Sequence, residues 1–403
     1  MNRSSHVALG ILLTLMMGLS ALAATIQPTH TPKKKTTAKV TETAHATTRK
    51  KSLSHSRTQV RTKAARRRYY ERFSASSFID GDQGVGDVTA GEDPVVRAAA
   101  IDALGNMNGT VVAIDPNSGR VLAMVNQKLA LSEGAQPCST FKVAVALAAL
   151  NEQVITKETK VSLGGSYKMD LTTALAHSNN AYFEAVGRKL GFEKVSYYAH
   201  QFGLGELAGW NMHGEHLGQF PSTELAESLG GVGKMCSFGE SISLTPLQLA
   251  AMIASISNGG TLYYLQHPTS PEEVANFAPR VKRYLDIKPL IPEISDGMAG
   301  AVQYGTARSL RANFYQEPVL GKTGTCSKDG TRFGWFGSFA DTEYGRIAVV
   351  VFLEGGRPTF GPKAAELAGK FYRNLYDHDF FAVRAPLTPV RAAQRTTGVS
   401  SER

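Results

Sequence analysis

The sequence predicts an α+β fold: a central antiparallel sheet covered by helices, joined to a mainly helical lobe. Three observations favour this class. Two strand-like runs stand early, at 110–115 and 120–125. Three more stand late, at 319–325, 332–340 and 347–353, and helical patterns dominate the stretch between the two groups. Strands linked by short turns pair antiparallel, and such a sheet must bury its apolar faces under helices.

The early elements follow from local patterns. Residues 95–104 fit a first helix, and the run Pro-Asn-Ser-Gly at 116–119 makes the turn between the first two strands. Residues 139–150 are dominated by Ala, Val and Leu with no polar face. That pattern predicts a helix buried in the middle of the domain.

The later elements complete the sheet. The three late strands are linked by the polar runs 327–331 and 341–345, which predicts an antiparallel meander. The remaining helical patterns lie at 181–190, 195–202, 246–257 and 363–376.

Charge is unevenly spread along the 403 residues, which hold 44 Lys and Arg against 34 Asp and Glu. Fourteen of the basic residues lie between Lys33 and Arg72, and the chain outside this segment and Arg3 carries 29 basic and 32 acidic residues. The folded part is therefore about neutral. Nucleic-acid binding by that part is not expected.

The first residues resemble an export signal. Arg3 and His6 precede an apolar run from Val7 to Leu22, and Ala21-Leu22-Ala23 has the small-x-small pattern that signal peptidase accepts. We predict a signal peptide at 1–23 and export to the periplasm or the outer face of the cytoplasmic membrane. The alternative is an uncleaved anchor, since sixteen apolar residues approach the length that spans a bilayer.

Residues 24–90 are predicted to be a disordered basic linker, because 24–68 contain scarcely any large apolar residue. Its Lys and Arg clusters suit electrostatic contact with an anionic envelope, and a solvated tether without a partner is the alternative. A folded domain is expected at 91–380 and a flexible C-terminal tail at 381–403.

Three short motifs carry the chemistry. Ser139 and Lys142 stand three positions apart at the start of a predicted helix, so they share one face. A serine nucleophile needs a base, and lysine serves as one only when burial or nearby positive charge lowers its pKa. Lys322 is a candidate source of that charge. The other two motifs are Ser178-Asn179-Asn180 and Lys322-Thr323-Gly324-Thr325.

The set S-x-x-K, S-x-N and K-T-G resembles the signature of penicillin-binding proteins and serine β-lactamases. The runs 109–124, 244–250 and 258–260 are similar to the first hairpin and a later helix of a penicillin-binding transpeptidase domain. The resemblance covers roughly residues 90 to 380 and implies the sandwich-like fold of that superfamily.

The resemblance also implies residue roles. Ser139 is the nucleophile, Lys142 its base, Ser178 a proton relay beside Lys322, and Asn180 a binder of a substrate amide. Backbone N–H groups of Ser139 and Thr325 form the oxyanion hole. Lys322 with the hydroxyls of Thr323 and Thr325 holds a substrate carboxylate, and Gly324 leaves room for the acyl group. No cofactor or metal is expected.

Three functions remain open at this point. The first is an exported D,D-transpeptidase or carboxypeptidase that acts on D-Ala-D-Ala peptidoglycan stem peptides and is acylated by β-lactams as covalent inhibitors. The second is a β-lactam hydrolase, and the third is a non-catalytic penicillin-binding sensor. Tyr304-Gly305 is followed by Thr306 rather than Asn, which favours the first.

The cysteines suggest a bridge. Cys138 directly precedes Ser139, and Cys326 directly follows Thr325. The resemblance places the backbone N–H groups of Ser139 and Thr325 around one oxyanion, so these residues should lie close together. We therefore expect the two cysteines to pair. Carbapenem-hydrolysing class A β-lactamases have a bridge at the equivalent positions. The alternative is two buried thiols, and Cys236 is expected to remain a thiol.

Overall fold

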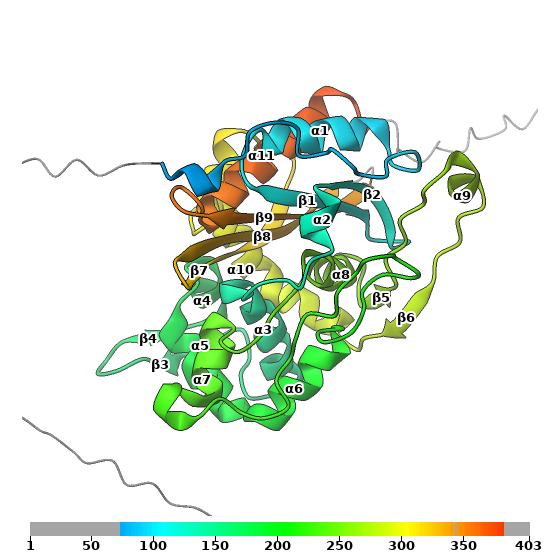
Figure 1. Ribbon diagram of the computed structural model, residues 1–403. Helices are drawn as coiled ribbons and strands as arrows, with labels where there is room; N and C mark the ends of the chain where they lie inside the picture. The colour runs from blue at the N-terminus through cyan, green and yellow to red at the C-terminus, as the bar shows by residue number, and fades with distance from the viewer. Residues whose placement is uncertain (1–72, 343–344, 383–403) are drawn as a thin grey trace, which may run out of the picture. The chain divides into compact units, whose positions relative to one another are not determined.

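The computed structural model describes residues 73–342 and 345–382, and Figure 1 shows the arrangement of the elements. Its centre is a five-stranded antiparallel sheet in the order β2-β1-β9-β8-β7, so β7 is an edge strand. This confirms the predicted α+β class. The strands are β1 (Gly109–Asp115), β2 (Arg120–Val125), β7 (Val319–Lys328), β8 (Thr331–Thr342) and β9 (Gly345–Gly355).

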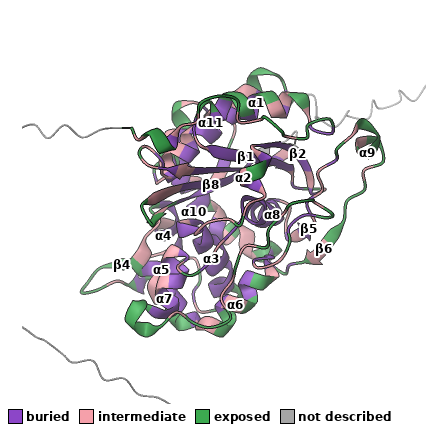
Figure 2. Ribbon diagram, viewed as in Figure 1, coloured by how far each residue is buried: buried purple, intermediate pink, exposed green. Residues whose placement is uncertain are grey.

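Strand alternation divides the core into two layers. In β9, Val349 and Val351 belong to one buried cluster, whereas Val350 and Phe352 belong to the other. Successive side chains of a strand point to opposite faces, so an apolar run such as β9 serves both layers. Figure 2 shows the central strands buried along their length.

Helices cover both faces of the sheet (Figure 1). On one face α1 (Pro94–Leu104) and α11 (Gly361–Asp377) pack against each other and against the strands. On the other face α8 (Pro246–Ser257) contacts β1, β8 and β9, and α10 (Ile291–Gln303) contacts β7. Thr245 and Gln248 form a capping box that fixes the start of α8.

The second lobe is mostly helical, as predicted. It contains α3 (Lys142–Asn151), α4 (Leu171–Ala176), α5 (Asn180–Leu190), α6 (Phe192–Gln201) and α7 (Gly231–Phe238). The short elements are α2 (Gln127–Ala130), α9 (Pro271–Ala275) and the two-stranded sheets β3 (Val161–Ser162) with β4 (Lys168–Met169) and β5 (Thr261–Tyr263) with β6 (Val281–Tyr284).

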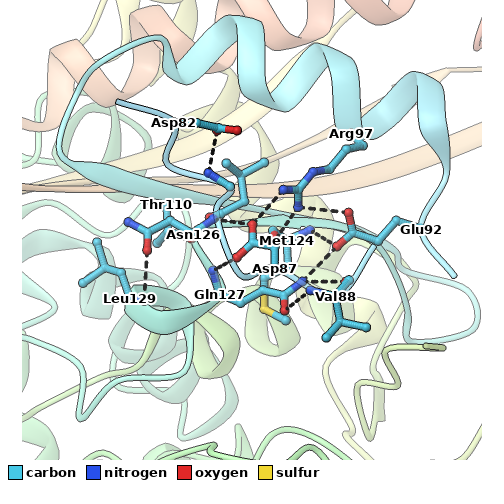
Figure 3. Close-up of polar contacts among 12 residues, drawn as sticks. Asp82, Asp87, Val88, Glu92, Arg97, Thr110, Met124, Asn126, Gln127 and Leu129 are labelled. Carbon is cyan, nitrogen blue, oxygen red and sulfur yellow. Dashed lines mark hydrogen bonds and ion pairs between the residues drawn. The ribbon is translucent and has the colours of Figure 1, made fainter. Parts of the chain in front are cut away.

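The structure of residues 73–90 differs from the predicted disordered linker. We expected it to belong to the disordered linker, but it packs on the sheet (Figure 3). The Asp87 carboxylate accepts hydrogen bonds from the backbone of Asn126 at 3.0 Å and Gln127 at 2.8 Å, and pairs with Arg97 at 2.7 Å. Glu92 pairs with the same arginine at 3.1 Å. These buried ion pairs hold the segment in place. Composition alone predicted no such contacts for it.

The chain ends lie partly outside the described residues. The predicted signal peptide, the linker up to residue 72 and the tail beyond residue 382 fall there. Phe380 and Phe381 are buried against the core, so the ordered domain continues slightly past the predicted boundary. Among the helices of residues 73–342 and 345–382, none has the length and apolarity to cross a membrane.

Candidate active site

The predicted nucleophile lies on a 3₁₀ turn, Cys138–Phe141, directly before α3. The sequence predicted one continuous helix from residue 139. Two hydrogen bonds shape the turn instead: Trp335 Nε1 donates to the Gln136 carbonyl at 2.9 Å, and Thr140 Oγ1 donates to the Pro137 carbonyl at 2.7 Å. Ser139 is half-buried, and Cys138 before it has the left-handed φ of +52°. That conformation is costly for a residue with a side chain and occurs often at functional sites.

Lys142 joins the first motif to the second. It is fully buried, and its Nζ donates to the Ser178 carbonyl at 2.8 Å, to Ser178 Oγ at 3.2 Å and to Asn180 Oδ1 at 2.6 Å. Ser139 Oγ has no hydrogen bond to Lys142 in this described region, so that contact stays a prediction. Catalytic hydrogen bonds often tighten only when a substrate is bound.

Lys322 brings in the third motif from the edge strand. It is fully buried, and its Nζ donates to Ser178 Oγ at 2.8 Å and to the Thr323 carbonyl at 3.1 Å. The Ser178 hydroxyl therefore lies between two amines. Ser178 has a φ of +56°, and the next residue, Asn179, caps α5 by accepting from the Tyr182 N–H at 2.9 Å.

Burial changes the titration of both lysines. Desolvation lowers the pKa of Lys142 to about 7, and the negative charge of Glu184 opposes this shift. The pKa of Lys322 is also well below its ordinary value, first because of burial and second because of the Lys142 charge. The sequence interpretation allowed either desolvation or the charge of Lys322 as the cause of a lowered Lys142 pKa. In the structure the main cause is desolvation.

The structure explains the need for glycine at position 324 differently from the sequence prediction. A Cβ at this position would lie 2.8 Å from the Pro137 carbonyl oxygen and 3.1 Å from Thr140 Cγ2. Strand β7 thus packs directly on the turn that carries Ser139, and only glycine allows this approach.

The two threonines of the third motif have partners that sequence reasoning missed. Thr323 Oγ1 donates to Thr306 Oγ1 at 2.6 Å, and Thr325 Oγ1 accepts from the Gly361 N–H at 2.8 Å, at the start of α11. The position of Thr306 directly after Tyr304-Gly305 could have indicated that it lies at the site. The sequence analysis used this run only to show that it differs from Tyr-Gly-Asn.

The predicted disulfide is present. Cys138 and Cys326 are bonded, with their Cα atoms 5.7 Å apart, and Cys236 is a buried thiol. The bridge links the residue before Ser139 to the residue after Thr325. It therefore ties the turn that carries Ser139 to the edge strand.

Comparison with known proteins agrees with this geometry. The family described as penicillin binding protein transpeptidase domain matches residues 109–377. The chain belongs to this family.

Several members resemble the chain at low identity. Stage V sporulation protein D of Bacillus subtilis is 26% identical over 65% of this chain and 48% of that protein. The peptidoglycan D,D-transpeptidase MrdA of Acinetobacter baumannii is 24% identical over 74% of this chain and 54% of that protein. The chain thus spans about half the length of both curated relatives. Among solved structures, the crystal structure of Pseudomonas aeruginosa PBP2 in complex with WCK 5153 resembles this fold with a TM-score of 0.58. The two sequences are 25% identical, and the match covers 71% of this chain and 74% of that chain.

Proposed function

We propose that this chain is an exported serine D,D-transpeptidase or carboxypeptidase that cleaves D-Ala-D-Ala stem peptides of peptidoglycan and is acylated by β-lactams at Ser139. One observation carries the proposal: Ser178 Oγ accepts hydrogen bonds from both Lys142 and Lys322. This links three separate motifs in one proton-transfer network beside the serine. The names of the relatives support the reaction class.

The acylation step uses this network. The Ser139 oxygen attacks the carbonyl carbon of the scissile bond while its proton passes to neutral Lys142. The leaving nitrogen receives a proton from the Ser178 hydroxyl, which is restored by a proton from an adjacent lysine. A serine ester forms and the terminal D-Ala leaves as the free amine.

Binding groups surround the reacting carbonyl. The N–H groups of Ser139 and Thr325 would hold the oxyanion, each worth about 3 to 4 kcal/mol. Thr325 Oγ1 accepts from Gly361, so its proton is free to be donated to a substrate carboxylate next to Lys322. Thr323 donates to Thr306 and must turn its hydroxyl to contribute. Asn180 Oδ1 is held by Lys142, which leaves its amide N–H₂ for the substrate.

The hydrolase alternative has less support. Hydrolysis of the serine ester needs a second base that activates water. Across residues 73–342 and 345–382, no carboxylate is hydrogen-bonded to Lys142, Ser178, Asn180 or Lys322. Glu184 instead pairs with Arg188 at 3.5 Å.

The pH dependence of acylation tests the role of burial. Neutral Lys142 is the active form, and its pKa is lowered to about 7. The rate of benzylpenicillin acylation should therefore rise about tenfold per pH unit below this value and level off above it. Stopped-flow measurement between pH 5 and pH 9, with tryptophan fluorescence as a check of folding, gives the profile. A flat rate on a folded protein would contradict the assignment.

A donor-partition assay tests the proposed reaction. The protein is incubated with an acyl-D-Ala-D-Ala peptide, with and without a D-amino acid as acceptor, and products are followed by mass spectrometry. We expect release of D-Ala, together with a transfer product when the acceptor is present, and neither with Ser139→Ala. Rapid turnover of benzylpenicillin without D-Ala release would favour the hydrolase, and a stable penicillin adduct without D-Ala release would favour the sensor.

A further inference from the structure

A pocket of about 460 Å³ lies at the edge of the sheet opposite to the catalytic strand (Figure 1). It forms where the segment between β5 and β6, which contains α9, folds against Trp210 and Asn211. Gln266 joins this segment to β2: its N–H donates to the Gly119 carbonyl at 2.9 Å, and its carbonyl accepts from the Val121 N–H at 2.8 Å. Because β2 and β7 are the two outer strands, the width of the sheet, about 19 Å, separates the pocket from the acylation site.

The walls of the pocket are held together by contacts within the protein. The Trp210 N–H donates to the Leu265 carbonyl at 2.8 Å, which ties the loop after α6 to the segment after β5. Glu206 in the same loop pairs with Lys282 and with Arg283 of β6, both at 2.6 Å. A pocket that is already held in place loses little conformational entropy when a ligand binds.

An indole ring supplies apolar surface to the pocket. Trp210 is 40% exposed, whereas Trp335 is fully buried. The Arg280 guanidinium lies over the Trp210 ring, 4.5 Å from its centroid, and Tyr264 makes a T-shaped contact with the same ring. Phe277 adds a second, half-buried ring to the lining. The C–H face of a sugar ring can bury apolar area against exposed aromatic surface of this kind.

The polar side chains of the lining offer several acceptors and one strong donor. Gln266 and Asn276 each donate their amide to a backbone carbonyl, at 2.9 and 3.0 Å, so each keeps a side-chain carbonyl oxygen for a ligand. Glu273 accepts from Thr269 through Oε2, which leaves Oε1. Arg280 pairs with no carboxylate in the described parts of the chain, so its N–H groups are available. Hydroxyl groups both donate and accept, so they match this set.

The charges of the lining favour an uncharged ligand. Arg280 and Glu273 carry opposite charges, and His267 is paired with Glu92 at 3.0 Å. A phosphate or carboxylate would be repelled by Glu273, and an ammonium would be repelled by Arg280. A neutral ligand with many hydroxyl groups meets neither repulsion.

We propose that this pocket is a glycan site, which holds an N-acetylated amino sugar of a peptidoglycan strand apart from the reacting stem peptide. The inference rests on the proposed function, because that function places the protein on a polymer of such sugars. Trp210 packs against the C–H face of the sugar, and Arg280 donates to the acetamido oxygen. The side-chain oxygens of Gln266, Asn276 and Glu273 accept from the sugar hydroxyls.

Binding of two tetrasaccharides tests the site. Chitotetraose and cellotetraose have the same sugar ring and linkage, and they differ only in the acetamido group. By isothermal titration calorimetry, we expect the Kd of chitotetraose to be lower by about tenfold. Trp210→Ala should raise this Kd by about tenfold, and Arg280→Met should remove the preference over cellotetraose. Tyr284→Ala, which removes an exposed aromatic ring outside the pocket, is the matched control and should change neither Kd.

Fluorine NMR locates the bound sugar. The chain has two tryptophans, so protein labelled with fluorotryptophan should give two signals, and Trp210→Phe identifies the signal of Trp210. Chitotetraose should shift that signal and leave the signal of Trp335 in place. Absence of binding, equal Kd values for the two sugars, or a Kd that Trp210→Ala does not change would overturn the glycan site.

Acylation separates this inference from the proposed function. Trp210→Ala should be acylated by benzylpenicillin at the wild-type rate, because the pocket lies at the other edge of the sheet. Normal acylation of a wild-type protein that binds neither sugar would overturn the glycan site alone. Absence of both acylation and D-Ala release on a folded wild-type protein would overturn the proposed function, and the glycan assignment that rests on it.

Discussion

Lys142→Ala is expected to slow acylation of Ser139 by about 10²- to 10⁴-fold, because it removes the proposed base for the serine proton. The structure supports this size of effect. Lys142 is fully buried, donates to two residues of the second motif, and has a pKa lowered to about 7. It therefore provides a neutral amine at physiological pH, which an ordinary lysine does not.

Asn180→Ala is the matched comparison. It removes one partner of Lys142, at 2.6 Å, and one donor to the substrate, but leaves the base in place. We expect its effect to be about tenfold. Lys142→Met, which keeps most of the side-chain volume, should be as slow as Lys142→Ala. The measurement is the rate of adduct formation with labelled penicillin, after thermal unfolding shows that each variant folds. Near wild-type rates for both Lys142 variants would refute its role as base.

Removal of the disulfide by Cys138→Ser with Cys326→Ser should lower the free energy of unfolding by about 2 to 5 kcal/mol. The bridge closes a loop between residues 188 positions apart, so it restricts the unfolded chain strongly. It also holds Cys138 in its left-handed conformation, next to Ser139. Acylation should slow as well, because the Ser139 and Thr325 N–H groups lose their fixed spacing.

The control for this variant is Cys236→Ala, which removes a buried thiol that takes no part in the bridge. Denaturant unfolding without reductant should show a much smaller loss of stability for this control. Intact-mass analysis of the denatured wild-type protein after alkylation should show one modified cysteine, Cys236. Modification of all three cysteines, or equal stability of the bridge variant and the wild type, would show that the bridge does not form or does not stabilise.

The sequence predicted the sheet well because its signals are local. Strands such as β9 are apolar runs bounded by turn residues, and the β1–β2 turn has Asp115 and Gly119 at the positions that favour it. The site was predicted from three motifs whose spacing and order are specific. That the motifs meet at one hydroxyl depends on tertiary packing, and no spacing along the chain encodes it.

The features that sequence reasoning missed depend on long-range contacts. Helix α7 begins with glycines and looks like a loop, yet Cys236 fits against Gly187 of α5, where an added Cβ would lie only 2.5 Å from the sulfur. The segment at 73–90 looks like a linker until Asp87 meets Arg97. Thr306 lies near Thr323 only because α10 packs on β7. Composition and periodicity cannot report contacts of this kind.

Mass mapping of the benzylpenicillin adduct tests the central claim most directly. After reduction and trypsin digestion, the adduct should lie on the peptide 129–142, which contains Ser132, Ser139 and Thr140. Fragmentation should place it on Ser139, and Ser132→Ala should leave it in place while Ser139→Ala removes it. An adduct on Ser132 or on any other peptide, or no adduct on a folded wild-type protein, would contradict the assignment of Ser139 as the nucleophile.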